Sequence, residues 1–160
     1  MPATYSSAGT AKLVGVARTK FYFGTTTTTA DNDAFVEIGS VMDGGNVGAT
    51  AQDIPVQLVG NNTTVHLKGT FDPGTQTLQL AQDLTDAGLL ALEAARVDQT
   101  NDYNVRLILP NPKTTTGTGD MITYKAKVMG INTELGGPNN PVKATVTLGL
   151  NSIRSFTSAT

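Results

Sequence analysis

The sequence DLTDAGLLALEAARVDQT, residues Asp83 to Thr100, is the one stretch of this chain with clear helical periodicity. One arc of its helical wheel holds Leu84, Ala87, Leu90, Ala91, Ala94 and Val97, and we expect this arc to be the buried face. Asp83 or Thr85 can cap the start of the helix, which we place at about residues 84–98. Because half of the arc is alanine, the helix axis can approach a sheet closely, so we expect the helix to cover a sheet.

Segments on both sides of this helix alternate between apolar and polar residues. The clearest are YNVRLIL (103–109), MITYKAKVMG (121–130) and PVKATVTLGLNSI (141–153). Such alternation is typical of antiparallel strands that have one side on a core and the other facing a polar environment. IPVQLVG (54–60) and TTVHLKGTF (63–71) alternate in the same way and, joined through GNN, predict a hairpin.

The first third of the chain predicts two more strands and two loops. KLVGVARTKFYFG (12–24) and AFVEIGSVMDGG (34–45) each predict a strand, and TTTTTADND between them predicts a loop. DGGNVGATAQD (43–53) is too long for a tight turn and predicts a projecting loop. The fold class that follows is mainly β, an antiparallel sandwich or barrel with one flanking helix. We expect one domain over residues 1–160, with a flexible N-terminal arm at about 1–11 and a C-terminal tail at about 155–160.

Composition excludes several classes of protein. The chain has 160 residues, 39% of them apolar, and no cysteine, so neither a disulfide framework nor a thiolate metal site is possible. No apolar run approaches the roughly 20 residues that a membrane span needs, so we expect no membrane insertion. The N-terminus lacks the features of a secretory signal. The formal net charge of -2 argues against an electrostatic grip on nucleic acid.

No group of residues predicts catalysis or metal binding. His66 is the only histidine, so a zinc site or a catalytic dyad would lack partners, and we interpret it as a solvated strand residue. DNDAFVE (31–37) has the oxygen-rich look of a calcium loop but lacks the glycine and spacing of an EF-hand. GTGD (117–120) and GGPNN (136–140) lack the lysine of a phosphate-binding loop and predict turns. We expect no enzyme activity and no cofactor.

The order of the segments resembles the tail-tube, or major tail, proteins of long-tailed bacteriophages. The early strand TKFYFG, the strand and turn FVEIGSVMDGG, the long polar loop and the hairpin come first. QTLQLAQ then leads into LTDAGLLALEAARVDQTNDYNVRLILPNP, followed by ITYKAKVMGINTELGGPNNPVKATVTLGLNSI. The part from the helix to the last strand is the most specific, and the resemblance covers most of the chain.

The resemblance implies a β-sandwich whose strands join those of its neighbours into a hexameric ring. Stacked rings would form a hollow tube through which the genome leaves the capsid, with the helix on the outer side of each subunit. It also implies tape measure, tail terminator and tip proteins as partners, and a virion protein made in the host cytoplasm. DNA would pass through the lumen without specific binding. The expected lumen-facing residues are Thr123, Lys125, Lys127, Thr145 and Thr147.

Charge is distributed unevenly along the chain. Phe21 to Leu67 contains five acids and no lysine or arginine, whereas Met121 to Thr160 contains four bases and one acid. In an open stack, one surface of each subunit meets a different surface of the next. We therefore expect contacts between subunits or rings at Asp31, Asp33, Asp43, Gly44, Gly45, Asn46, Asp53, Lys143 and Arg154.

The sequence is compatible with two other classes of protein. One is the tube protein of a contractile tail or of a related secretion or injection apparatus. Another is a bacterial surface β-sandwich that binds carbohydrate, which would share the threonine and glycine content but should bring a signal peptide and exposed aromatic platforms. The chain has nine aromatic residues, five Phe and four Tyr, which disfavours that second alternative.

Overall fold

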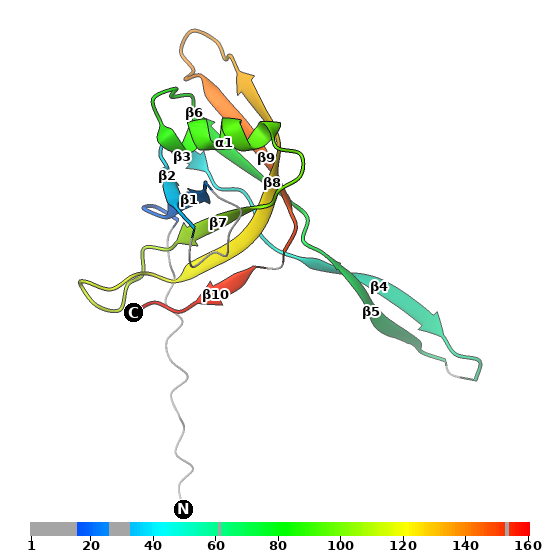
Figure 1. Ribbon diagram of the computed structural model, residues 1–160. Helices are drawn as coiled ribbons and strands as arrows, with labels where there is room; N and C mark the ends of the chain where they lie inside the picture. Colours follow the sequence, from blue (N-terminus) through cyan, green and yellow to red (C-terminus); the bar gives the residue numbers. More distant parts are fainter. Residues whose placement is uncertain (1–15, 26–32, 61, 153) are drawn as a thin grey trace, which may run out of the picture.

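The computed structural model describes residues 16–25, 33–60, 62–152 and 154–160, and within them the chain forms ten strands and one helix (Figure 1). In chain order they are β1 (Lys20–Gly24), β2 (Phe35–Ile38), β3 (Val41–Asp43), β4 (Thr50–Gln57), β5 (Thr64–Asp72), β6 (Thr75–Ala81), α1 (Ala87–Val97), β7 (Tyr103–Ile108), β8 (Met121–Glu134), β9 (Lys143–Leu150) and β10 (Ser155–Thr157). The prediction of a mainly β, antiparallel fold with a single helix is confirmed for the described residues.

Eight of these strands belong to one sheet, which rolls up on itself. Seven follow the order β2-β1-β7-β8-β9-β6-β3, and β10 pairs with β8 beside this row. β2 and β3 are the two ends of the row, yet only Gly39 and Ser40 separate them in sequence. Three Cα–Cα steps span at most about 11 Å. The two ends of the sheet must therefore lie close together, which gives the barrel-like form that the alternating sequence predicts.

The core lies between the inward side of the rolled sheet and one side of α1. Its sheet residues are Phe21, Phe23, Ile38, Leu78, Leu80, Val105, Leu107, Tyr124, Ala126, Val128, Ala144, Val146, Leu148 and Leu150. Along β9 the buried and half-buried positions alternate without a break. The period-two pattern thus predicts correctly which side chains of β8 and β9 face inward.

Helix α1 packs with a different side than the sequence predicts. Its buried residues are Gly88, Leu89, Leu92 and Ala95, whereas Leu90 is 52% exposed and Val97 is 74% exposed. The predicted arc is therefore wrong except for Ala91, which is partly buried against the core. Both arcs are rich in apolar residues, and Gly88 decides between them, because only a residue without a side chain lets the helix lie directly on the backbone of β2. A Cβ atom at Gly88 would sit 2.5 Å from Ile38 Cα.

The start of α1 is tied to the corner between β2 and β3. Asp86 is the N-cap, and its Oδ1 accepts a hydrogen bond from the Gly88 N–H at 3.3 Å. The same carboxylate accepts the Gly39 N–H at 3.2 Å. Neither Asp83 nor Thr85, the expected caps, fills this role, because Asp83 instead accepts the Thr85 hydroxyl at 2.6 Å. Capping by Asp86 makes the helix shorter than the predicted 84–98.

A carboxylate also organises the end of α1. Asp98, the C-cap residue, accepts hydrogen bonds from the Asn101 side chain at 2.8 Å, the Thr100 N–H at 2.9 Å and the Tyr103 hydroxyl at 2.9 Å. These bonds, that from the Asn101 side chain above all, lower the pKa of Asp98. The Tyr103 ring stacks on Phe23, with centroids 5.4 Å apart, so the cluster joins the helix to β7 and the core.

Four predicted segments differ in the structure. The strand expected at 12–24 begins at Lys20 within the described residues. The single strand expected at 34–45 is two strands, β2 and β3, because Ser40 adopts a left-handed conformation with φ 56° and turns the chain. The loop expected at 43–53 ends before Thr50, where β4 begins. The expected C-terminal tail contains β10, and Ala159 is buried, with its N–H donating to Asp120 at 2.7 Å. The expected N-terminal arm at 1–11 lies outside the described residues.

Candidate assembly surfaces

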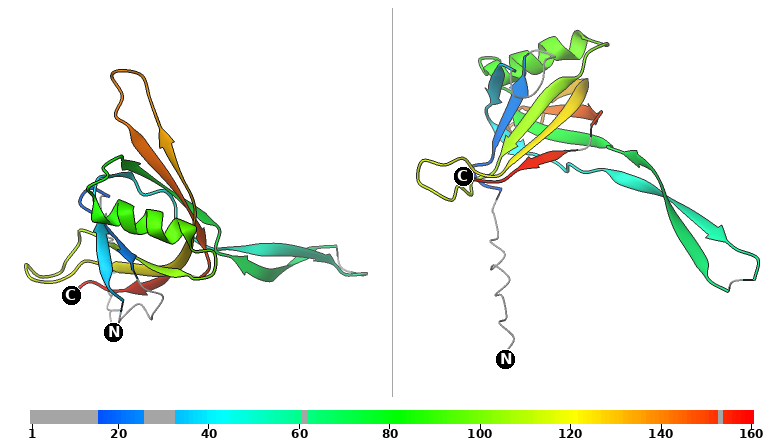
Figure 2. Two further views of the ribbon diagram at one scale, coloured as in Figure 1. Left: turned by 45° about the horizontal axis from the view of Figure 1, so that its top comes forward. Right: turned by 60° about the horizontal axis from the view of Figure 1, so that its bottom comes forward.

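β4 and β5 form a separate two-stranded sheet that extends far from the rest of the subunit (Figures 1 and 2). We call residues 50–72 the projecting hairpin. The sequence predicts a hairpin here, and this is confirmed. It also predicts that one side of each strand rests on the core, and this is wrong, because no residue of the two strands is buried.

The projecting hairpin has one apolar and one polar face. Opposite residues of an antiparallel pair point to the same side, and the register places Ile54 opposite Leu67 and Val56 opposite Val65. These four residues are the apolar face. Ile54 is 43% exposed and Leu67 is 52% exposed, so the face lies largely open to solvent. The chain covers it with none of its described residues.

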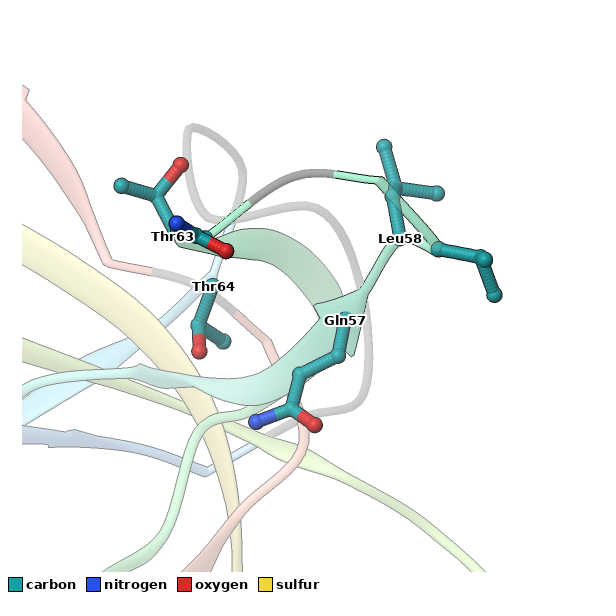
Figure 3. A pocket seen from close by; sticks show the side chains of 6 residues that line it. Gln57, Leu58, Thr63 and Thr64 are labelled. Carbon is teal, nitrogen blue, oxygen red and sulfur yellow. The ribbon is translucent and has the colours of Figure 1, made fainter.

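The polar face carries the only histidine. His66 lies opposite Pro55, and its Nδ1 is 2.8 Å from Asp53 Oδ2, with both side chains more than 60% exposed. Exposed pairs of this kind contribute about 0–1 kcal/mol. A shallow hollow at the end of the hairpin is lined by Gln57, Leu58, Val59, Asn62, Thr63 and Thr64 (Figure 3). No carboxylate, imidazole or amine lines it, so it offers no acid or base for catalysis.

The expected contact residues fall into separate groups. Asp31 lies outside the described residues, and Asp33 accepts a hydrogen bond from Asn104 at 2.8 Å. Asp43 ends β3 and accepts the Gly45 N–H at 2.8 Å, and Gly44, Gly45 and Asn46 continue from it. Asp53 lies on the projecting hairpin instead. The structure therefore does not place these acids on one loop.

The two expected basic residues, Arg154 and Lys143, have different surroundings in the subunit. Arg154 donates to the Val47 carbonyl of its own chain at 2.6 Å, so it already holds the loop after β3. Lys143 begins β9 and is half-buried. Both lie at the surface of the subunit, and neither contacts Asp43 or Asp53 through an ion pair within the described residues.

Two buried polar side chains, Tyr124 and Gln76, connect the core to the loop after β3 by hydrogen bonds. The Tyr124 hydroxyl donates to Gln76 Oε1, and Gln76 Nε2 donates to the Gly44 carbonyl at 2.7 Å. Burial raises the pKa of Tyr124, so the hydroxyl keeps its proton and remains a donor. The loop is thus held from the core by Gln76 and from the surface by Arg154.

The expected lumen-facing residues share one side of the sheet. Thr123, Lys125 and Lys127 of β8 alternate with buried residues, and so do Thr145 and Thr147 of β9. The register carries this side onto β6, where Thr77 lies opposite Thr147 and Gln79 opposite Thr145. Lys127 donates to the carbonyls of Gln99 at 3.2 Å and Thr100 at 2.9 Å, which holds its charge against the loop after α1.

Neither a metal site nor a membrane helix is found among the described residues. They contain no cluster of three or more histidine, cysteine or acidic side chains suited to a metal ion. The helix they contain falls short of the length and apolar character needed to cross a membrane.

The uncovered face of the projecting hairpin is the feature that sequence reasoning missed. Its alternation is the same as that of a strand on a core, so the pattern alone does not distinguish the two. The available signal is the flanking sequence, because glycine-rich residues 44–49 precede the hairpin and Pro73 and Gly74 follow it. Such flanks are typical of loops, and a loop on each side allows the hairpin to leave the sheet.

No family model and no curated protein matches this sequence. Solved structures do match it. A chain of the anti-feeding prophage baseplate, symmetrised 6-fold, has a TM-score of 0.73 and 15% identity over 93% of this chain and 98% of that chain. A chain of the sheath/tube terminator of the PVC extracellular contractile injection system has a TM-score of 0.66 and 15% identity over 92% and 98%.

The SPP1 tail tube protein, solved by solid-state NMR and cryo-EM, has a TM-score of 0.65 and 12% identity over 88% of this chain and 77% of that chain. At these identities the likeness concerns the fold. The chain has the fold shared by phage tail-tube proteins and by tube components of contractile injection systems, as its sequence resemblance implies.

Proposed function

We propose that this chain is a structural subunit that assembles with copies of itself into a hollow tail tube. One observation carries the proposal: a subunit with the tail-tube fold extends a hairpin whose apolar face its own described residues leave uncovered. A two-stranded hairpin is marginally stable by itself in water. A neighbouring copy that covers this face would stabilise the hairpin and join the two subunits.

The tube is proposed to consist of stacked hexameric rings. The 6-fold symmetry of the baseplate that contains a similar chain supports this number. The side of the sheet with Thr77, Thr145 and Thr147 is proposed to line the lumen, together with Thr123, Lys125 and Lys127. It carries the hydroxyls of Thr77, Thr123, Thr145 and Thr147 beside Lys125 and Lys127. The two lysines make this lumen less acidic than the net charge of -2 suggests, and DNA can slide where basic residues are not densely clustered, because phosphate binding depends on such clusters.

The proposed cargo is the phage genome during its ejection into the host. Tape measure and tail terminator or tip proteins would be the partners, the virion the location, and the host cytoplasm the place of synthesis. A tube of a contractile injection system is the second candidate, supported by the near-complete coverage of chains from two such systems. Both candidates are non-enzymatic.

Electron microscopy of the purified chain tests the tube assignment. We expect rings or hollow tubes, and a reconstruction should place the Thr145 and Thr147 side toward the channel. A protein that stays monomeric at high concentration, with or without a tube fragment as seed, would contradict the proposal.

We also propose that charge steers assembly, with Asp43 and Asp53 approaching Lys143 and Arg154 of an adjacent subunit. Isolated surface pairs contribute about 0–1 kcal/mol each, but a closed ring repeats every pair. Raising salt to about 1 M shortens the screening length to about 3 Å. Tube nucleation, followed by light scattering, should therefore slow as salt rises.

A charge-reversal pair tests the same contact. Asp53→Lys should slow nucleation, and adding Lys143→Glu should partly restore it. Lys143 is the better second site, because reversing Arg154 would also break its bond to the Val47 carbonyl. Nucleation that is equally fast in Asp53→Lys and wild type across the salt range would remove the steering mechanism.

A further inference from the structure

Helix α1 has a second apolar side, which points away from its own subunit. Ala87, Leu90, Ala94 and Val97 follow one another at helical spacing, and all four are exposed. We call these four residues the outer stripe. No charged residue belongs to it, because Glu93 and Arg96 lie to one side and pair with each other at 2.9 Å.

Small and large side chains alternate along the outer stripe. Ala87 and Ala94 leave the helix surface low on either side of Leu90, and Leu90 and Val97 supply the apolar contact. From Ala87 to Val97 the stripe is about 15 Å long, at the rise of an α-helix. A partner that covers it should therefore be apolar and of similar length.

The apolar face of the projecting hairpin has these properties. Along β4 it runs through Ile54 and Val56, and Leu58 continues it, pointing away from Gln57 at the hairpin end (Figure 3). From Ile54 to Leu58 the distance is about 13 Å, at the rise of a strand. The paired strands present Ile54, Val56, Val65 and Leu67 on one face, so the ribbon can lie along a helix stripe in which Ala87 and Ala94 leave room for these side chains.

The two surfaces of one subunit cannot meet each other. The projecting hairpin extends outward from the body and away from α1, as Figure 2 shows. Each subunit therefore offers one apolar ribbon and one apolar stripe, in equal numbers and on different surfaces. This is the arrangement that heterologous, head-to-tail association requires, because one copy supplies the partner that the next one lacks.

We propose that the apolar face of the projecting hairpin of one subunit packs on the outer stripe of α1 in an adjacent subunit. This inference rests on the proposed tube function and names the surface that receives the hairpin. The apolar face of the hairpin and the outer stripe are then each other's partners. The contact is directional, because the hairpin of one subunit binds the helix of the next.

Cysteine cross-linking tests this contact, because the chain contains no cysteine of its own. Val56→Cys and Leu90→Cys are made as two separate variants, each is co-assembled with wild-type chain, and a third sample contains both. Disulfides form only where Cα atoms come within about 7 Å. After mild oxidation, we expect a disulfide-linked dimer from tubes that contain both variants and none from tubes that contain one. Val56→Cys mixed with Lys113→Cys, on the exposed loop before β8, is the matched control.

Three results overturn the inference. Tubes that give no dimer with Val56→Cys and either Leu90→Cys or Val97→Cys would show that the stripe faces something else, while the tube function stands. An equal yield of dimer with Lys113→Cys would show that the cross-link is unspecific. Wild-type chain that forms no tubes would remove the proposed function and this contact together.

A second variant tests the stripe without a cross-link. Leu90→Asp places a charge in the proposed contact at an exposed position, so the subunit should stay folded by circular dichroism. We expect tube formation to require at least about tenfold more protein. Tubes that form at the wild-type concentration would overturn the inference.

Discussion

A chain with Ile54→Thr and Leu67→Thr is expected to fold but to form no tubes at concentrations where the wild type assembles. The two residues lie opposite each other on the projecting hairpin, and both are largely exposed in the subunit. Their replacement therefore removes little from the core of the monomer. Threonine is β-branched and is favoured in strands, so the hairpin can retain its conformation.

The expected size of this effect follows from the apolar area. Fully burying a leucine or isoleucine side chain contributes about 1.5–3 kcal/mol, and roughly half of that remains to be gained when the hairpin docks. The double variant loses two such contributions at each contact. Because about 1.4 kcal/mol corresponds to a tenfold change in the association constant, the critical concentration should rise at least about tenfold. Sedimentation and electron microscopy over a concentration series measure it.

The control for this variant lies on the polar face of the same hairpin. His66→Ala removes the exposed pair with Asp53, and surface changes of this kind usually stay within about 0.5 kcal/mol. We expect it to assemble like the wild type. If the threonine double variant also assembles at the wild-type concentration, the hairpin's apolar face does not hold the tube together.

Gly88→Ala is expected to destabilise the folded subunit by about 1–3 kcal/mol, the range for overpacking a close contact. Two effects oppose each other here. Alanine is favoured over glycine within a helix by about 1 kcal/mol, but its Cβ would lie 2.5 Å from Ile38 Cα and 2.6 Å from the Glu37 carbonyl oxygen. Both of these atoms belong to the backbone, so no side-chain rotation relieves the overlap, and α1 must move off β2.

Urea unfolding followed by far-UV circular dichroism measures this effect, which suits a chain without tryptophan. Gly48→Ala is the matched control, because a Cβ there would meet no atom within 4 Å. We expect its unfolding midpoint to stay near that of the wild type. A Gly88→Ala chain as stable as the wild type would mean that α1 does not lie as close to β2 as described.

Alternation in the sequence predicts the strands and their inward sides well where they pack on their own core. In β9, Ala144, Val146 and Leu148 follow the period of two and are fully buried. The same pattern in the projecting hairpin predicts the same burial and is wrong. Alternation with a period of two shows which side chains share a face of a strand. It contains no information about what covers that face.

The candidate assembly surfaces also combine features that the sequence predicts with features that it does not. The sequence resemblance predicts the tail-tube fold, and the structural matches confirm that fold. The expected contact and lumen residues stay predictions, although the structure places Thr123, Lys125, Lys127, Thr145 and Thr147 on one side of the sheet. The two acidic residues lie on different parts of the subunit, because Asp43 ends β3 on the body and Asp53 belongs to β4 of the projecting hairpin.

The amino-acid sequence by itself determined the class of fold, the single helix between β6 and β7, and the absence of thiol chemistry, because these depend on local periodicity and composition. Tertiary structure alone decided three other points: which side of α1 is buried, that residues 34–45 form two strands, and that the hairpin leaves the core. Each of them depends on contacts between residues far apart in the chain. The approach of Gly88 to Ile38, and the closing of the sheet by β2 and β3, arise only when the whole sheet has formed.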